Sequence, residues 1–271
     1  MESNSESGAS ADILTAKQSL VIDEQRWQRI RFGVSCLDRL TGGGLSSRGI
    51  VEIAGEAGSG KTQLALHLSL AAQLFSLPPK GVVYISTEHT FPSRRIVQME
   101  QAMRQNSDKT NCKESNLTDN IFVEHLHNPV SLELCISERL SVLLENNPIR
   151  LLVIDSITAV YAEEQNYIER AHSFRRVVRA LHALQERFDF GVVCTNQVRS
   201  VIDDFSLDDE KIVPALGLSW ASLVHTRLQI SRINGAAAQR TCRLLFSPSV
   251  PQGECYFAIT ERGISEKTEV R

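Results

Sequence analysis

Residues 55–62 have the types and spacing of a loop that cradles the phosphates of a nucleoside triphosphate. The eight residues of this P-loop are Gly55, Glu56, Ala57, Gly58, Ser59, Gly60, Lys61 and Thr62. Its glycines let the backbone turn with N–H groups pointing inward, and the start of a following helix adds partial positive charge. Lys61 can reach the outer phosphates, and the Thr62 hydroxyl can ligate Mg²⁺. The segment therefore predicts a nucleoside triphosphate site.

Three more side chains that could do chemistry each follow a short apolar run. The runs are residues 82–86, 151–154 and 190–195. Asp155 ends the second run, where its carboxylate can hold Mg²⁺ through water beside the P-loop. Glu88 follows the first run and is a candidate base for activating water, and a solvated loop carboxylate is the alternative that the residues leave open. Gln197 follows the third run, where its amide can bond a γ-phosphate and shift the next loop.

These side chains meet only if the runs are parallel strands, because the carboxyl ends of parallel strands share one edge of a sheet. Residues 49–54 are typical of a buried strand before the P-loop, and residues 63–74 of a helix after it. Further helices are expected over residues 35–40, 94–103, 131–145 and 170–188, and further strands over 121–126, 222–230, 241–246 and 254–259. The last three strands show no helix signal between them and have a hairpin tip at residues 235–238. The predicted fold is α/β, with a mostly parallel central sheet flanked by helices and an antiparallel C-terminal edge.

The whole chain has the composition of an ordinary globular protein, with 271 residues of which 42% are hydrophobic and 23% charged. Its formal net charge of −3 excludes a uniformly basic nucleic-acid-binding surface but leaves room for a local one. The six cysteines are far apart, so we expect reduced thiols, mostly in the core, rather than a zinc site or a disulfide framework. Neither a signal peptide nor a membrane-spanning apolar run is visible, so an intracellular, soluble protein is expected.

Composition also divides the chain into a core with short flanks. Residues 1–12 are rich in Ser, Glu, Asn and Gly and are predicted to be a disordered tail. A linker over residues 13–30, a core over 31–265 and a C-terminal tail over 266–271 complete the predicted division. Ile13 and Ala16 frame a small apolar island at the start of the linker. The residues alone favour the first turn of a linker helix, and a docking peptide that fills pockets on a neighbouring subunit is the alternative.

Taken together, these motifs resemble the RecA-type recombinase core, which is a P-loop ATPase. The resemblance covers residues 13–265 and rests on residues 42–45, 55–62, 84–88, 151–156 and 195–197. Residues 247–251 and 257–259 look specifically like the eukaryotic branch, and residues 13–16, 91–92 and 121–125 look most similar to a paralogue of the main strand-exchange recombinase. The resemblance implies a RecA-like core that binds ATP with Mg²⁺.

The resemblance also implies roles for individual residues. Glu88 becomes the residue that activates water, and Gln197 becomes the sensor of the γ-phosphate. Ile13 and Ala16 fall on the motif through which one protomer docks on the next, so the resemblance favours the docking interpretation. Residues 247–251 match the segment that caps the ATP of the neighbouring protomer.

Two loops that face DNA in the family match residues 162–169 and 199–213 of this chain. Their candidate DNA contacts are Tyr167, Arg170 and Arg199. The second loop carries five acidic and two basic side chains, a net formal charge of −3, which is poor chemistry for gripping a phosphate backbone. The small N-terminal domain of the main recombinase is also expected to be missing ahead of the linker.

These departures favour a mediator in homologous-recombination repair over an independent recombinase. Its expected partners are another recombinase paralogue or the main strand-exchange recombinase, with single-stranded or branched DNA reached through that complex and no membrane. This function implies that the protein acts in the nucleus. The expected setting is repair of double-strand breaks, and meiotic recombination as well. The alternatives are a scaffold whose assembly is gated by nucleotide with negligible hydrolysis, and a self-sufficient filament former. Weak, DNA-dependent ATPase activity is expected of the mediator.

Overall fold

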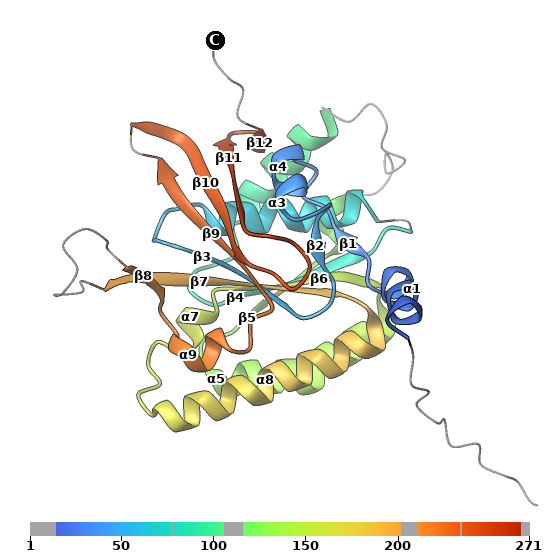
Figure 1. The fold of residues 1–271 in the computed structure, drawn as a ribbon, viewed down its shortest axis with the longest axis vertical. Coiled ribbons are helices and arrows are strands. Elements are labelled where there is room, and N and C mark those ends of the chain that lie inside the picture. Colours follow the sequence, from blue (N-terminus) through green and yellow to red (C-terminus); the bar gives the residue numbers. More distant parts are fainter. Residues whose placement is uncertain (1–14, 77, 106–115, 202–210, 234, 267–271) are drawn as a thin grey trace, which may run out of the picture.

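One large β-sheet runs through the molecule, and helices cover both of its faces (Figure 1). The computed structural model describes residues 15–76, 78–105, 116–201, 211–233 and 235–266 of the chain. The strand order is β12-β11-β10-β9-β3-β7-β6-β4-β5, with β8 added to β7. The strands of this sheet are β3 (Ile50–Gly55), β4 (Gly81–Ser86), β5 (Ile121–His125), β6 (Ile149–Asp155), β7 (Gly191–Val201), β8 (Lys211–Pro214), β9 (Thr226–Ile233), β10 (Ala236–Phe246), β11 (Gly253–Thr260) and β12 (Gly263–Glu266).

The P-loop strand β3 lies in the middle of this sheet, between β7 and β9, and is parallel to both. Strands β4, β5, β6 and β7 are also parallel to one another, whereas β9 to β12 pair antiparallel. All residues of β3 and β4 are buried, as expected for strands covered on both faces. The predicted α/β fold with an antiparallel C-terminal edge is confirmed.

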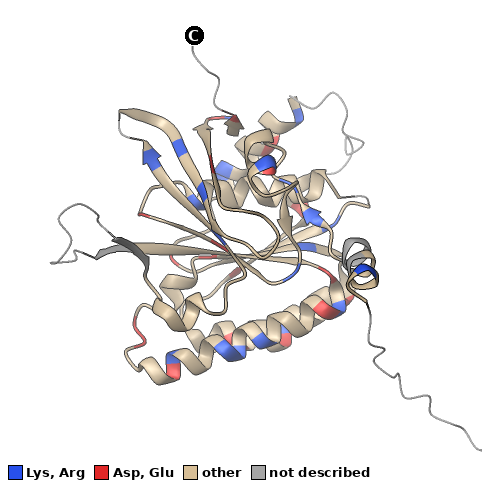
Figure 2. Cartoon of the chain, in the orientation of Figure 1, with Lys and Arg blue, Asp and Glu red and all other residues tan. Residues whose placement is uncertain are grey.

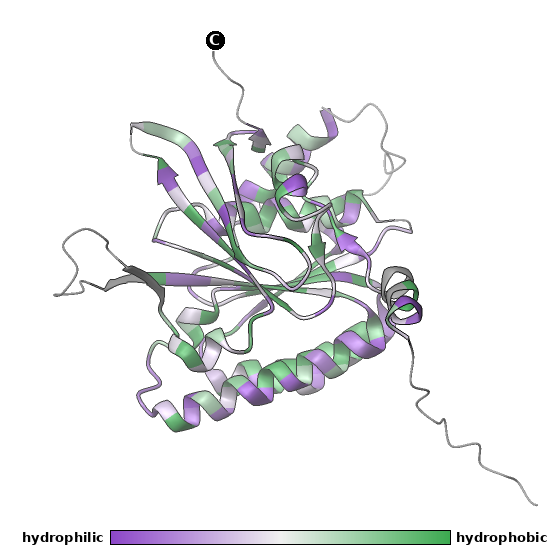
Figure 3. Cartoon of the chain, viewed as in Figure 1, coloured by the Kyte–Doolittle hydropathy of each residue, from purple (hydrophilic) through white to green (hydrophobic). Residues whose placement is uncertain are grey.

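The helices form two layers, one on each face of the sheet, and each layer packs on its own hydrophobic core (Figure 1). Figure 3 shows hydrophobic residues along the central strands, and hydrophobic and hydrophilic residues alternating along the long helix α8. The first layer consists of α2 (Ser35–Leu40), α3 (Lys61–Leu74), α4 (Ser93–Gln105) and the short 3₁₀ turn η1 (Leu117–Asn120). The second layer consists of α5 (Pro129–Leu134), η2 (Cys135–Arg139), α6 (Leu140–Asn146), α7 (Ile157–Val160), α8 (Tyr167–Phe188) and α9 (Gly217–Ala221).

Helix α8 covers the second face along its whole length and is amphipathic. Phe174, Val177, Val178 and Leu181 are buried on its inner side. Figure 2 shows basic and acidic residues interspersed on its outer side, where ion pairs reach neighbouring elements, for example from Arg176 to Glu133. The apolar face of such a helix packs on the core and stabilises it, and the charged face is exposed to solvent.

Several element boundaries differ from the prediction. Helix α8 begins at Tyr167, not near residue 170, because the Asn166 side chain accepts from the N–H groups of Ile168 and Glu169 and caps the first turn. The helix expected over residues 131–145 is three consecutive segments, with the π-helical turn η2 between α5 and α6.

The last third of the chain departs further from the prediction. Residues 217–221 form helix α9, so the strand expected from residue 222 begins only at Thr226. Strand β10 begins at Ala236, so most of the expected hairpin tip at residues 235–238 belongs to the strand itself. Strand β7 extends to Val201 and pairs with β8, so both ends of the segment expected to be the second DNA-facing loop are strands.

The N-terminal part of the described chain lies beside the main sheet. Helix α1 (Ala16–Arg26) is followed by a two-stranded antiparallel sheet of β1 (Arg29–Ile30) and β2 (Leu45–Ser46). Ala16 is the first residue of α1 and is exposed, whereas Ile13 lies outside the described residues.

Candidate nucleotide-binding site

The P-loop connects β3 to α3 through a backbone that only glycine adopts easily. Gly58 has φ of 68° and Gly60 has φ of 108°, both in the left-handed region. A Cβ atom added at Gly60 would lie 2.3 Å from Cδ1 of Ile259, which packs against the loop from β11. Gly60 is the N-cap residue of α3, so the helix begins directly at Lys61. The loop therefore presents a helix N-terminus at the end of a central strand, the geometry that proteins use for phosphates.

The Lys61 ammonium lies inside the loop. Its Nζ donates to the carbonyl oxygens of Gly55 at 2.8 Å and Glu56 at 2.9 Å. Burial lowers the pKa of Lys61, while the nearby carboxylates of Asp155 and Glu88 act in the opposite direction. Burial takes water away from the Lys61 ammonium. An anion bound beside it and beside the helix N-terminus would stabilise its positive charge.

Asp155 ends β6 and is fixed by two hydroxyl groups. Tyr84 donates to Oδ2 at 2.6 Å, and Thr195 donates to Oδ1 at 2.5 Å. The pKa of Tyr84 is raised well above its ordinary value, first by burial and then by the Asp155 charge, so the phenol remains a donor. Asp155 and Thr62 line the same cavity. Together they present a carboxylate and a hydroxyl, oxygen donors of the type that suits Mg²⁺.

Glu88 and Gln197 are in direct contact at the sheet edge. The Gln197 Nε2 donates to Glu88 Oε1 at 2.9 Å, and the Ser156 hydroxyl donates to the same oxygen at 2.8 Å. The Gln197 backbone N–H in turn donates to the Thr158 hydroxyl at 2.9 Å. Glu88 itself is exposed, so water reaches the carboxylate. The peptide bond between Asp155 and Ser156 is cis.

A cavity of about 400 Å³ brings most of the predicted residues together. Its lining includes Ala57, Gly58, Gly60, Lys61, Thr62, Glu88, Asp155 and Gln197. Gly55, Glu56 and Ser59 belong to the loop but do not line this cavity. Ser59 Oγ is buried and has no hydrogen-bond partner within the described part of the chain. The arrangement fits a triphosphate with a hard divalent cation.

Two arginines that sequence reasoning missed hold the P-loop from the C-terminal strands. Arg232 Nε donates to the carbonyl oxygen of Gly58 at 3.0 Å, and Arg240 Nε donates to that of Ser59 at 2.7 Å. Arg240 also lines the cavity. No local pattern could have identified them, because each is more than 170 residues from its partner in the chain.

A buried polar network lies behind the P-loop, around Glu52 in the middle of β3. Glu52 is fully buried, and its Oε1 accepts from Asn196 Nδ2 and from Trp220 Nε1, both at 2.6 Å. Its Oε2 accepts from Nε of Arg227, which completes a buried ion pair. Asn196 extends the network by accepting from the Thr158 hydroxyl at 2.6 Å. The network links the P-loop strand with β7, β9 and α9.

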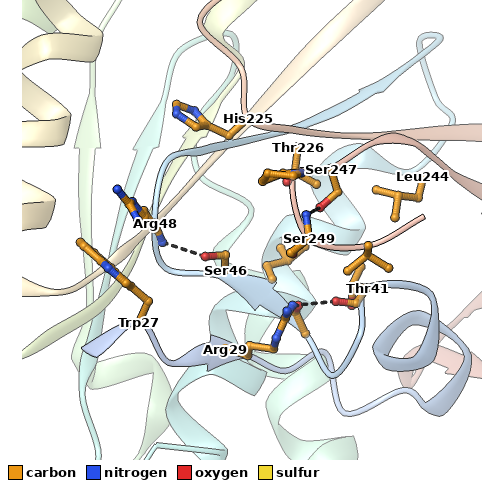
Figure 4. A pocket seen from close by; sticks show the side chains of 14 residues that line it. Trp27, Arg29, Thr41, Ser46, Arg48, His225, Thr226, Leu244, Ser247 and Ser249 are labelled. Carbon is orange, nitrogen blue, oxygen red and sulfur yellow. Dashed lines mark hydrogen bonds between the residues drawn. The ribbon is translucent and has the colours of Figure 1, made fainter. Parts of the chain in front are cut away.

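A second cavity, of about 580 Å³, lies away from the P-loop, where the N-terminal segment meets residues 247–250 (Figure 4). Its basic side chains are used within its own wall. Arg29 donates to the carbonyl oxygen of Thr41 at 2.9 Å, and the Arg48 guanidinium lies 5.6 Å from the ring centroid of Trp27. This cavity shares no lining residue with the nucleotide cavity.

The candidate DNA contacts lie on different elements. Tyr167 is 75% exposed in the first turn of α8, and the Arg170 guanidinium lies 5.0 Å from its ring centroid. Arg199 pairs with Val213 across the β7–β8 ladder, and its side chain is outside the described atoms. Within the described ranges, no helix combines the length and apolarity that crossing a membrane requires.

Comparison with known proteins places these features in context. The profile of the Rad51 family matches residues 24–267. The chain is 32% identical to the DNA repair protein XRCC3 of Mus musculus over 264 residues, which cover 89% of this chain and 76% of that protein. It is 34% identical to the DNA repair protein XRCC3 of Bos taurus, with 89% and 75% covered. It is 29% identical to the XRCC3 homolog of Arabidopsis thaliana, with 88% and 92% covered.

Proposed function

Because the chain belongs to the Rad51 family, we propose that it is an ATP-binding recombinase paralogue that acts in DNA repair by homologous recombination. One observation carries this proposal. Lys61, Thr62, Asp155, Glu88 and Gln197 surround a single cavity, although they come from four separate stretches of the chain. The relatives named above are DNA repair proteins, which supports repair as the setting and the nucleus as its location.

The phosphate end of the site would hold Mg·ATP. Lys61 would bind the outer phosphates, and the Thr62 hydroxyl and the Asp155 carboxylate would hold Mg²⁺. When bound, Mg²⁺ neutralises charge on the phosphate oxygens. Tyr84 and Thr195 orient Asp155 by occupying one lone pair on each carboxylate oxygen, which leaves the remaining lone pairs for the metal or its water.

At the γ-phosphate, Glu88 would act as the general base that activates water. Its carboxylate is exposed and can accept a proton from a water held in line with the γ-phosphate. Gln197 shares Oε1 of this carboxylate with Ser156, so an amide that turns toward a phosphate must give up its bond to Glu88. Because Gln197 lies on β7, this exchange of partners would shift the strand that leads to residues 202–210.

A mediator role fits the charge of the chain. The segment over residues 199–213 has five acidic and two basic side chains, which weakens its attraction to a phosphate backbone. Tyr167, Arg170 and Arg199 are the candidate DNA contacts, and they would act within a complex. Ile13 and Ala16 would dock this chain on another recombinase paralogue or on the main strand-exchange recombinase.

Light scattering coupled to size-exclusion chromatography tests the mediator role. The full chain is run alone and with candidate recombinase paralogues, with and without Mg·ATP. A monomer that forms a discrete complex with one partner supports the proposal. Long homopolymers that form only with Mg·ATP would contradict it and favour a self-sufficient filament former. Ile13→Glu should weaken the complex without changing the fold, and unchanged retention of the partner would remove the docking role.

Turnover separates an ATPase from a nucleotide-gated scaffold. Glu88→Gln keeps the size of the side chain but removes the base, so ATP hydrolysis by the DNA-bound complex should fall by about 10²–10⁴-fold while ATP still binds. Glu138→Gln, an exposed glutamate on η2, is the matched control and should leave hydrolysis unchanged. Equal, negligible hydrolysis in the unmodified protein and in both variants would favour the scaffold.

A further inference from the structure

Three cysteine thiols meet where α2 packs on the β10–β11 hairpin. Cys242 on β10 and Cys255 on β11 are directly opposite each other in the antiparallel ladder. Cys36 on α2 donates from Sγ to the carbonyl oxygen of Tyr256 at 3.3 Å. Cys36 thus lies against β11 at Tyr256, the residue that follows Cys255 in the chain. None of the three lines the nucleotide cavity, so the cluster is a feature that the proposed function does not use.

The three sulfurs differ in exposure. Cys242 is fully buried and Cys36 is 8% exposed, whereas Cys255 is only half-buried. Two other cysteines of the described chain, Cys135 and Cys194, are buried on the opposite face of the sheet. Cys255 is therefore the thiol of this cluster that a small solute reaches first.

The three sulfurs also differ in acidity. The pKa of Cys255 is lowered, chiefly by the neighbouring Cys242 thiol; burial acts in the opposite direction, and Cys36 and the nearby Arg39 lower it further. Burial raises the pKa of Cys36 to about 12, and the negative charge on Cys255 contributes to that increase. The pKa of Cys242 is raised well above its ordinary value, first by the neighbouring Cys255 and then by burial. A partly exposed sulfur whose pKa is lowered, next to buried thiols, is the arrangement in which cysteine oxidation becomes site-selective.

We propose that Cys255 is an oxidation site for hydroperoxides and that Cys36 is the thiol that resolves the oxidised sulfur into a disulfide. The Cys255 thiolate attacks one peroxide oxygen, the O–O bond breaks, and the other oxygen takes a proton and leaves as an alcohol or water. The Cys36 sulfur then attacks the sulfur of the resulting sulfenic acid. The S–O bond breaks, and the departing hydroxide takes the Cys36 proton and leaves as water. Two thiols are oxidised by two electrons, and the hydroperoxide is reduced by two.

Cys36 is better placed than Cys242 to form this bond. Opposite residues of an antiparallel ladder have Cβ atoms about 4.5–5.5 Å apart, but a disulfide needs about 3.5–4.5 Å. A bond between Cys242 and Cys255 would require the two strands to move closer together, whereas Cys36 lies on a separate short helix that packs against β11. Oxidation of Cys255 also removes the negative charge that raises the pKa of Cys36, which favours the second step. The product ties α2 to the strand that follows residues 247–252.

Hydrogen peroxide and mass spectrometry test the proposal on the full chain. All samples carry Cys112→Ser, so that this further thiol takes no part in the oxidation. After peroxide treatment, alkylation of free thiols and digestion, we expect a peptide pair joined through Cys36 and Cys255. In Cys36→Ser, oxidation should stop at a sulfenic acid that dimedone labels at Cys255. Cys135→Ser is the matched control and should leave the joined pair unchanged.

The same experiment can overturn the proposal without relying on the folding of Cys36→Ser or Cys135→Ser. In the otherwise unmodified protein, Cys255 should be oxidised at least about tenfold faster than Cys135, because thiolate character and exposure set the rate. Equal rates at the two positions, or first labelling at another cysteine, would remove Cys255 as the site. A bond from Cys255 to Cys242 would overturn the assignment of Cys36 as the resolving thiol.

Discussion

Replacing Glu52 by Gln should cost about 3–5 kcal/mol of unfolding free energy, because the change leaves the Arg227 charge buried without its counter-charge. Glu52 is fully buried, and the Arg227 side chain is 9% exposed, so water compensates neither. If the Gln oxygen takes the place of Oε1, the bonds from Asn196 and Trp220 survive. The NH₂ group of the Gln then faces the Arg227 guanidinium, and because both groups are hydrogen-bond donors, no bond forms between them. The loss is large beside the total stability of about 5–15 kcal/mol expected of a globular protein.

Urea unfolding followed by far-ultraviolet circular dichroism measures this loss. The midpoint should fall while the slope with urea stays constant, because the surface exposed on unfolding does not change. Glu145→Gln is the matched control: it breaks the Arg187–Glu145 pair, in which both side chains are about half exposed. That exposed pair should contribute no more than about 1 kcal/mol. A Glu52→Gln loss no greater than the control's would refute the reasoning that the buried pair holds β3 in the sheet.

Three further changes have defined outcomes. Burial lowers the pKa of His67 from 6.5 to about 4. Between these two pH values the unfolded chain binds a proton at His67 that the folded chain does not bind. About 3 kcal/mol of unfolding free energy that is present above pH 6.5 should therefore be lost as the pH falls to about 4. His67→Gln should flatten that dependence of the urea midpoint. Tyr84→Phe removes the bond to Asp155 and should cost about 2 kcal/mol in urea unfolding; no change would mean that solvent replaces the bond. Gly60→Ala places Cβ against Ile259 and should abolish binding of a fluorescent ATP analogue in titration, and retained affinity would show that the loop absorbs the methyl group.

Much of the candidate site was predictable because its signals are local or follow from a general rule. Strand, glycine loop and helix are contiguous in the P-loop, so their spacing alone defines the element. Glu88, Asp155 and Gln197 were placed together because parallel strands share a carboxyl edge, and the three do line one cavity. The start of α8 was predicted three residues late, although Asn166 followed by Glu169 three residues later is a pattern typical of a helix N-terminus.

Other features depend on contacts that no local pattern encodes. The acidic side chain of Glu52 interrupts an apolar strand, and only the fold brings Arg227 to it from 175 residues away. Arg240 reaches the P-loop from 181 residues away by the same kind of tertiary contact. Helix α9 has five residues, too few for a helical periodicity to emerge, so it was not predicted, and the predicted strand began directly after it at residue 222. Long-range packing, rather than propensity, decides such positions.

The place of β3 in the centre of the sheet has a consequence for how the protein opens. Its residues are all buried and are paired with strands on both sides, so its amide hydrogens should exchange with solvent only when the whole domain unfolds. A ligand that binds the folded state at the end of this strand would slow that exchange by the factor 1 + L/Kd, where L is the free ligand concentration. The exchange rates of these six residues would therefore separate a variant that has lost affinity from one that has lost its fold.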